Sequence, residues 1–270
     1  MPRFAPLEGI RVLDLSKVLA GPQCAQYLGE LGADVIKVEP AQGDDTRAWP
    51  PFEQGVGTIF LSANRNKRGV ALDLKSDEGR AVCRRLAERA DVVLESFGPG
   101  VAARLGVDHE SLSAINPRLV YCSISGYGSV GPMREGKGYD VILQAFSGML
   151  SMTGEPGGPP SRSPFSPVDQ GTGMHAVIGI LGALLQRAST GRGAKVEASL
   201  FDTADAPLIL GVANDALWVA FCRVAGAPGL ATRPGFEKKA ERVARRAETV
   251  AEDIDGLRRR GVVVAPPAGA

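Results

Sequence analysis

The sequence predicts an α/β protein built on a doubly wound parallel sheet. Short apolar runs, such as residues 10–15 and 34–39, alternate with segments whose apolar residues recur at helical spacing. This alternation continues for about 125 residues, and strands that are joined through helices run parallel. The chain has 270 residues, of which 44% are hydrophobic and 23% charged. That composition is ordinary for a globular protein with a sizeable core.

Each element follows from the same patterns. After the first strand, a helix is predicted at 23–31 before the strand at 34–39. The later strands are predicted at 69–74, 91–95, 119–124 and 194–201, and the later helices at 77–90, 140–150 and 170–188. Glycine- and proline-rich tracts at 126–138 and 154–167 predict loops.

Beyond residue 206 the composition turns rich in alanine and arginine. Two helical stretches are predicted there, at 215–226 and 237–257. We therefore expect a large Rossmann-like domain at 1–205, a reduced and mostly helical small domain at 206–260, and a tail at 261–270.

Charge and cysteine usage narrow the possible classes of function. The formal net charge is only +1, so nothing favours non-specific binding of nucleic acid or an anionic membrane. The apolar runs fall short of the ~20 residues that span a bilayer, and the first residues lack the core of a signal peptide, so we expect a cytoplasmic protein. Four scattered cysteines and two histidines form no ligand pattern, so no metal is expected.

Residues 126–131 read GYGSVG and match the dinucleotide pattern G-x-G-x-x-G. The motif requires its third glycine to open a helix whose N-terminus faces the pyrophosphate. The following residues, PMREGKG, predict a continued loop instead. Chance occurrence of the pattern in a glycine-rich chain is therefore favoured over a nicotinamide site.

Two other features are compatible with a phosphate-bearing ligand. The turn at 16–22 leads into the first helix, and Glu39 closes the second strand where a ribose-binding acid would stand. Basic residues cluster at 64–68, with Arg104 and Lys137 in later loops. Such charges are either solvated surface or converge on one anionic ligand.

Asp169 is the sharpest candidate for chemistry. It directly precedes the apolar helix, and no other carboxylate lies between Glu155 and Glu197. An aspartate there is either the N-cap of the helix or a nucleophile whose ionised form the helix N-terminus favours. Gly171 and Gly173 are expected to leave room for a substrate.

Seven spaced motifs together closely resemble the class III coenzyme A transferases, the CaiB/BaiF family. They are LEGIRVLDL at 7–15, AGP at 20–22, LGADVIKVE at 31–39, NKR at 66–68, FGPG at 97–100, GYG at 126–128 and TGRG at 190–193. The resemblance runs almost continuously to about Ala204. It implies a Rossmann-like large domain, a small domain and an interlocked homodimer.

The resemblance also implies an activity and a set of site residues. Asp169 falls on the catalytic aspartate, which forms an aspartyl anhydride and then an aspartyl-CoA thioester while CoA moves from an acyl-CoA to a small carboxylic acid. No metal takes part. The implied CoA-binding positions are Leu19, Ala20, Leu72, Asp73, Leu74, Lys75, Ser96, Phe97, Gly98, Arg104, Lys137, Gly138, Tyr139 and Asp140.

Two departures from the family keep alternatives open. Related 2-methylacyl-CoA racemases carry a histidine base where this chain has Tyr139, which favours a transferase over a racemase. Relatives also continue after Ala204 through a glycine-rich tract that closes over the aspartate, whereas this chain passes into residues 212–218, which resemble the start of the small domain. An internal deletion with a C-terminal truncation is therefore expected, and an impaired CoA-binding remnant is the third hypothesis.

Overall fold

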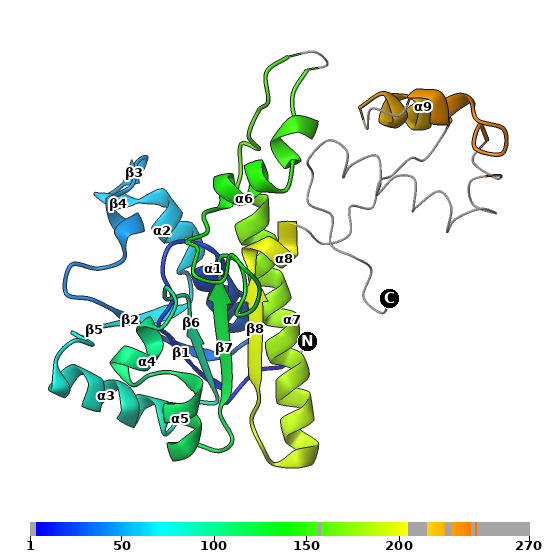
Figure 1. Ribbon diagram of the computed structural model, residues 1–270. Helices are drawn as coiled ribbons and strands as arrows, with labels where there is room; N and C mark the ends of the chain where they lie inside the picture. The colour runs from blue at the N-terminus through cyan, green and yellow to red at the C-terminus, as the bar shows by residue number, and fades with distance from the viewer. Residues whose placement is uncertain (1–3, 156–157, 205–214, 225–227, 239–240, 242–270) are drawn as a thin grey trace. The chain divides into compact units, whose positions relative to one another are not determined.

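The computed structural model describes residues 4–155, 158–204, 215–224, 228–238 and 241 (Figure 1). The chain divides into two compact units, Met1–Ala206 and Pro207–Ala270. Each unit is described by itself below.

A six-stranded parallel sheet forms the centre of the first unit. Its strands are β1 (Arg11–Asp14), β2 (Asp34–Glu39), β5 (Lys67–Ala71), β6 (Val92–Glu95), β7 (Val120–Ser125) and β8 (Lys195–Ser199). They are ordered β5-β2-β1-β6-β7-β8, and every neighbouring pair is parallel. This is the 3-2-1-4-5-6 order of Rossmann-like sheets, with its switch point between β1 and β6. The predicted α/β class is confirmed.

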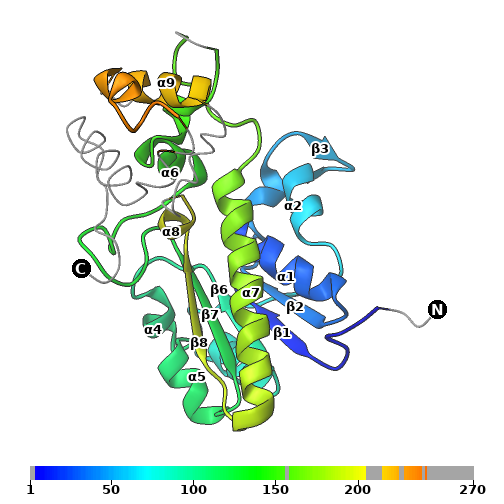
Figure 2. The same ribbon diagram turned by 90° about the vertical axis from the view of Figure 1, so that its right-hand side faces the viewer.

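Helices cover both faces of this sheet (Figures 1 and 2). One face carries α1 (Ala20–Glu30) and α7 (Pro167–Thr190), and the other carries α3 (Asp77–Ala87), α4 (Val101–Leu105) and α5 (His109–Ile115). Successive strand residues point to opposite faces, so Val12 packs into the first core and Leu13 into the second. Both layers bury apolar side chains, which explains the apolar strand runs in the sequence.

Helix α7 is longer than predicted, because it begins three residues earlier, at Pro167, and continues to Thr190. By length and mean hydropathy it is the one helix among the described residues that could cross a membrane. It packs against α1, β7 and β8 and contributes Ala176 and Ile180 to the first core. These contacts are those of a core helix.

Several short elements were not predicted. The segment between β2 and β5 forms a 3₁₀ turn (Asp45–Ala48), a hairpin of β3 (Phe52–Glu53) and β4 (Val56–Gly57), and α2 (Thr58–Ala63). The helix predicted at 140–150 divides into α6 (Asp140–Phe146) and a 3₁₀ turn (Met149–Met152), because Gly148 lies between them at φ 82°. The last strand ends at Ser199, and α8 (Leu200–Ala204) follows.

The second unit has a small core of its own. Helix α9 (Asp215–Val224) confirms most of the predicted helix at 215–226, and a 3₁₀ turn (Pro228–Thr232) follows. Trp218, Cys222, Leu230 and Phe236 are buried together. The tail at 261–270 and nearly all of the helix predicted at 237–257 lie outside the described residues.

Candidate active site

The candidate site lies beyond the carboxyl ends of the strands, at the switch point between β1 and β6. The loops that follow these two strands are joined through Ser96. Its hydroxyl accepts a hydrogen bond from the Lys17 backbone N–H at 3.0 Å and donates to the Lys17 carbonyl at 3.4 Å. Ligands of doubly wound sheets bind in the crevice at this position. Leu19 and Ala20, which begin α1, lie just beyond Lys17.

Buried polar side chains fix the turn after β1 through hydrogen bonds to Ser16. Asp14 ends the strand with no exposed surface, and its Oδ1 accepts hydrogen bonds from the Ser16 hydroxyl and, at 2.9 Å, from the Ser16 backbone N–H. Lys37 of β2 donates from Nζ to the Ser16 carbonyl at 2.9 Å. Val18 is held at φ 71°, a left-handed conformation that a β-branched residue rarely adopts. The turn is therefore preorganised by its surroundings.

Two lysines and two aspartates form a buried ion-pair network under this turn. Lys67 donates to Asp14 Oδ2 at 2.9 Å, to the Pro22 carbonyl at 2.7 Å and to Asn64 Oδ1 at 2.8 Å, which uses all three of its N–H groups. Lys37 lies 3.1 Å from Asp44 Oδ2.

Burial and neighbouring charges act in opposite directions on these groups. Burial alone raises the pKa of Asp14, but the Lys67 and Lys37 ammonium groups hold that pKa below its usual range. Burial lowers the pKa of Lys67, and the Asp14 carboxylate opposes that shift. Each charge in the network therefore depends on its partners.

The cations of the basic cluster at 64–68 are paired with acidic residues of the chain. Lys67 is buried against Asp14, Arg65 pairs with Glu30 at 2.7 Å, and Arg68 pairs with Asp34 at 2.6 Å. These partners neutralise the three charges, and convergence of the cluster on an anionic ligand stays a prediction.

Glu39 is also already occupied. Its two oxygens accept hydrogen bonds from the Arg47 guanidinium at 2.7 and 2.8 Å, and Oε2 also accepts the Asp44 backbone N–H. The carboxylate therefore stabilises the segment after β2 and does not present a free acceptor to a ribose.

Asp169 lies in the first turn of α7 but does not cap it. The N-cap position is Ser166, whose side chain makes no capping hydrogen bond. The cap comes from Asp140 of α6, whose Oδ2 accepts the backbone N–H groups of Val168 at 2.9 Å and Asp169 at 3.0 Å. The capping role considered for Asp169 was therefore wrong, since a residue distant in sequence performs it.

Asp140 is in turn held by Gln144. The Gln144 amide N–H donates to Asp140 Oδ1, and its carbonyl oxygen accepts the Ser163 backbone N–H at 3.0 Å. Both side chains are buried. The start of α6, the loop before α7 and the first turn of α7 are thus joined by one hydrogen-bonded chain that fixes the position of Asp169.

The Asp169 carboxylate itself makes no hydrogen bond within the described part of the chain. Burial, and after it the negative charge of Asp140, raise the pKa of Asp169 to about 7. A carboxylate that is poorly solvated and free of partners is a stronger nucleophile than an ordinary surface aspartate. A pKa near neutrality also places its ionisation within the working range of an enzyme.

The two glycines after Asp169 allow close packing of α7. A Cβ on Gly173 would lie 2.8 Å from the Ala20 carbonyl oxygen of α1, and one on Gly171 would lie 2.8 Å from the Thr203 side chain of α8. Gly173 therefore lets α7 approach the start of α1 closely. The same contact links the Asp169 helix to the first turn, and room for a substrate at these glycines stays a prediction.

The remaining predicted binding residues occupy loops at the same edge of the sheet. Leu72, Leu74 and Phe97 are partly buried against the second core, and Gly98 is exposed. Asp73 accepts the Lys75 backbone N–H at 2.9 Å, a local turn before α3. Tyr139 is 55% exposed beside the first turn of α6. A Cβ on Gly138 would lie 2.5 Å from the Gly126 backbone, so this loop packs against the end of β7.

Three of the predicted CoA-binding residues are cations that have no acidic partner among the described residues. Lys75, Arg104 and Lys137 are exposed, and within the described ranges no carboxylate lies at ion-pair distance from any of them. They differ in this respect from Arg65, Lys67 and Arg68. In the same described ranges, no three His, Cys, Asp or Glu side chains gather where they could hold a metal ion.

Comparison with known proteins identifies the class of protein. The family model of CoA-transferase family III matches residues 7–205 and 199–259. The succinate–glutarate CoA-transferase of Agrobacterium fabrum is 39% identical over 291 positions, which cover 91% of this chain and 73% of that protein. The succinyl-CoA:glutarate CoA-transferase of Mus musculus is 44% identical over 77% of this chain, which spans only 48% of the mouse protein.

A solved structure agrees with these sequence matches. A CaiB/BaiF family protein from Brucella suis superimposes with a TM-score of 0.74 at 34% identity, covering 98% of this chain and 84% of that one. The chain therefore belongs to CoA-transferase family III, a family of transferase enzymes. The Agrobacterium alignment is longer than the 270 residues of this chain, so the relative carries residues that this chain lacks.

Proposed function

We propose that this protein transfers CoA between an acyl-CoA thioester and a carboxylic acid, with Asp169 as the nucleophile. The observation that carries the proposal is the environment of Asp169: a carboxylate with no hydrogen-bond partner among the described residues and a pKa raised by burial to about 7, in the first turn of a helix that Asp140 caps. The named activities of the Agrobacterium and mouse relatives make a dicarboxylate such as succinate or glutarate the first acceptor to test.

The reaction would proceed through acyl groups held on Asp169. A carboxylate oxygen attacks the thioester carbonyl, the C–S bond breaks, and CoA thiolate leaves behind a mixed anhydride. The thiolate then attacks the aspartyl carbonyl and expels the donor acid, which gives an aspartyl-CoA thioester. The acceptor carboxylate displaces CoA from this thioester, and the returning thiolate takes the acceptor acyl group and frees Asp169.

The other predicted residues have supporting roles in this proposal. Lys75, Arg104 and Lys137 would pair with CoA phosphates, since each is exposed and without an acidic partner among the described residues. The turn from Ser16 to Ala20 is rigidly held by Ser96 and the buried lysines, so its backbone would meet CoA without reorganising. Asp140 acts as a positioning residue, because both its oxygens are used inside the protein.

A family dimer is part of the same proposal. Met174, Ile178 and Leu185 lie exposed along α7, with Ile178 67% and Leu185 76% accessible. A second copy of the chain that covers this apolar stripe would lower its contact with water. Light scattering on the purified protein measures its molecular mass directly, and the mass of a monomer would contradict the proposed dimer.

Intact-protein mass spectrometry tests the nucleophile. Incubation with succinyl-CoA should produce a covalent adduct, and hydroxylamine should convert it into a hydroxamate that maps to Asp169. The Asp169→Asn variant should lose the adduct and reduce turnover at least about a thousandfold. The control is Glu110→Gln, since Glu110 is an exposed acid on α5. A folded wild-type protein that shows no adduct would refute the transferase proposal and leave the CoA-binding remnant.

The racemase alternative makes a different prediction. It requires exchange of the α-proton of a 2-methylacyl-CoA with solvent, which adds one mass unit in heavy water. Tyr139 stands at the position where that chemistry needs an imidazole base, and its side chain is more than half exposed. Exchange without any CoA transfer would favour the racemase.

A further inference from the structure

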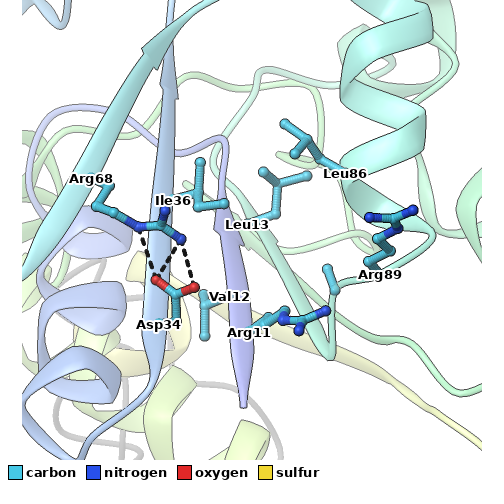
Figure 3. Close-up of a pocket in the computed structure, with 9 residues that line it drawn as sticks. Arg11, Val12, Leu13, Asp34, Ile36, Arg68, Leu86 and Arg89 are labelled. Carbon is cyan, nitrogen blue, oxygen red and sulfur yellow. Dashed lines mark hydrogen bonds and ion pairs between the residues drawn. The ribbon is translucent and has the colours of Figure 1, made fainter. Parts of the chain in front are cut away.

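A pocket lies at the opposite end of the strands from Asp169. It has a volume of about 310 Å³, and its lining is drawn in Figure 3. Arg11 and Asp34 are the first residues of β1 and β2, and Leu86 comes from the last turn of α3. The pocket thus opens where the amino ends of the strands meet the end of α3. Leu13 and Ile36 of the pocket directly precede Asp14 and Lys37 of the ion-pair network, but successive side chains of a strand point to opposite faces, so the sheet itself separates the pocket from that network.

The floor of this pocket is apolar. Leu13 lies at its base with 2% of its surface exposed, and Ile36 and Leu86 are partly buried beside it (Figure 3). Arg11 and Leu13 share one face of β1, as Asp34 and Ile36 share one face of β2, because side chains alternate along a strand. Charged groups therefore form the rim, and hydrocarbon forms the floor.

The charges on the rim are not balanced. Arg11, Arg68 and Arg89 all line the pocket, with Asp34 as the single acid. Asp34 is engaged by Arg68, which reaches its two oxygens at 2.8 and 2.6 Å from Nη2. Figure 3 shows the Arg11 and Arg89 side chains on the other side of the pocket from this pair.

Asp91, which contacts the backbone of Arg11, is also occupied. Asp91 accepts the Arg11 backbone N–H at 2.9 Å and pairs with the Arg187 guanidinium at 2.9 Å. Within the described residues, no carboxylate lies at ion-pair distance from the guanidinium of Arg11 or Arg89. Two cations thus stand above an apolar floor without an anion between them.

We propose that this pocket is a second binding site, for a small monocarboxylate with an aliphatic tail. The carboxylate would lie between the guanidinium groups of Arg11 and Arg89, whose planar N–H donors match its two oxygens. The tail would cover Leu13, Ile36 and Leu86. A cation would be repelled, and a fully hydrated phosphate would gain nothing from the floor. The site does not depend on the proposed transferase function.

Isothermal titration calorimetry of the full chain with hexanoate, without acyl-CoA and at constant ionic strength, tests the site. Saturable binding is expected, weakening about fourfold for each methylene removed on the way to acetate. The double variant Arg11→Gln/Arg89→Gln should weaken hexanoate binding at least tenfold. The matched control is Arg84→Gln/Arg85→Gln, which removes two exposed charges from α3 outside the pocket and should change the affinity less than twofold.

Several outcomes would overturn the proposal. They are the absence of saturable hexanoate binding at millimolar concentrations, equal affinity of the Arg11/Arg89 double variant and the wild type, and equally tight binding of hexylammonium or inorganic phosphate. Circular dichroism of both double variants verifies that they remain folded, which is expected because all four side chains lie at the surface. The titration needs no turnover, so its result is independent of the adduct experiment at Asp169.

Discussion

The three strands β1, β2 and β5 carry charged residues on both faces of the sheet, and the two faces bury them to different degrees. On the face that α1 covers, Asp14, Lys37 and Lys67 have side chains no more than 2% exposed, and each is paired. On the α3 face, the Arg68 and Asp34 side chains are 67% and 47% exposed, and Arg11 and Arg89 have no acidic partner among the described residues. The same residue types are buried ion-pair partners on one face and exposed on the other.

Lys67 and Arg68 show the difference within two consecutive residues of β5. Successive side chains on a strand point to opposite faces, so Lys67 reaches Asp14 under α1, whereas Arg68 reaches Asp34 on the α3 face. Removing one partner of a buried pair leaves an uncompensated charge in a low dielectric. Removing one partner of an exposed pair returns the other to water. Burial, and not charge, therefore decides what each residue does for the fold.

Lys67→Met is expected to have the largest effect on stability. It leaves Asp14 with only part of its compensating charge, so the free energy of unfolding should fall by roughly 3 to 5 kcal/mol. Chemical denaturation with urea measures this change. The matched control is Arg68→Met, which should cost no more than about 1 kcal/mol. Similar losses of unfolding free energy at the two positions would refute the contrast between the two faces of the sheet.

Asp169→Asn should have the next largest effect, and its sign depends on pH. The folded protein holds the Asp169 proton up to a pKa of about 7, whereas an unfolded aspartate releases it near pH 4. The wild-type protein therefore loses stability through this group as pH rises from about 4 to 7, and the loss does not grow further above that range. At pH 8 the variant should be more stable than the wild type by roughly 2 to 4 kcal/mol.

Urea denaturation of Asp169→Asn and the wild type at pH 4, 6 and 8 measures this difference. If the difference in unfolding free energy between the variant and the wild type does not grow with pH, the raised pKa of Asp169 is contradicted. The same pKa predicts that turnover by the wild type rises between pH 6 and 8, because only the carboxylate form attacks.

Val18→Gly should have the smallest effect, and it should be stabilising. Val18 holds φ 71° because the residues around it fix the turn, and glycine adopts that conformation without strain. The greater freedom of glycine in the unfolded chain offsets part of the gain, so an increase of up to about 1 kcal/mol is expected. Thermal unfolding measures it. A clear loss of stability would mean that the Val18 side chain contributes more by packing than its backbone costs.

Local patterns were sufficient to predict the sheet and the candidate nucleophile. The apolar runs of β1, β2, β6 and β7 and the long apolar helix are continuous in sequence, so their periodicity can be read directly. The hairpin of β3 and β4 was missed because its two-residue strands carry no periodicity. The division of the helix at 140–150 was missed as well, although Gly148 was a visible signal.

The partners of the charged residues could not be predicted in the same way. Asp14 and Lys37 adjoin the apolar residues of β1 (RVLD) and β2 (DVIKVE), and a charged residue that is buried with such neighbours needs a partner of opposite charge. The sequence pattern does not show which residue is the partner, because Asp14 and Lys67 are 53 residues apart in the chain. The cap that Asp140 provides to α7 crosses 28 residues to Val168 and is hidden for the same reason.

The sequence by itself determined the class of fold, the order of its main elements and the acidic residue at the start of α7, since each is encoded within a short window of the chain. Only the tertiary structure decided that Asp140 caps that helix, that Lys67 is buried while Arg68 is exposed, and that Arg11 and Arg89 face one pocket. These properties depend on which distant segments meet and on how much water they exclude. Electrostatic free energy varies steeply with both, so the chemistry of a side chain is settled by its neighbours in space.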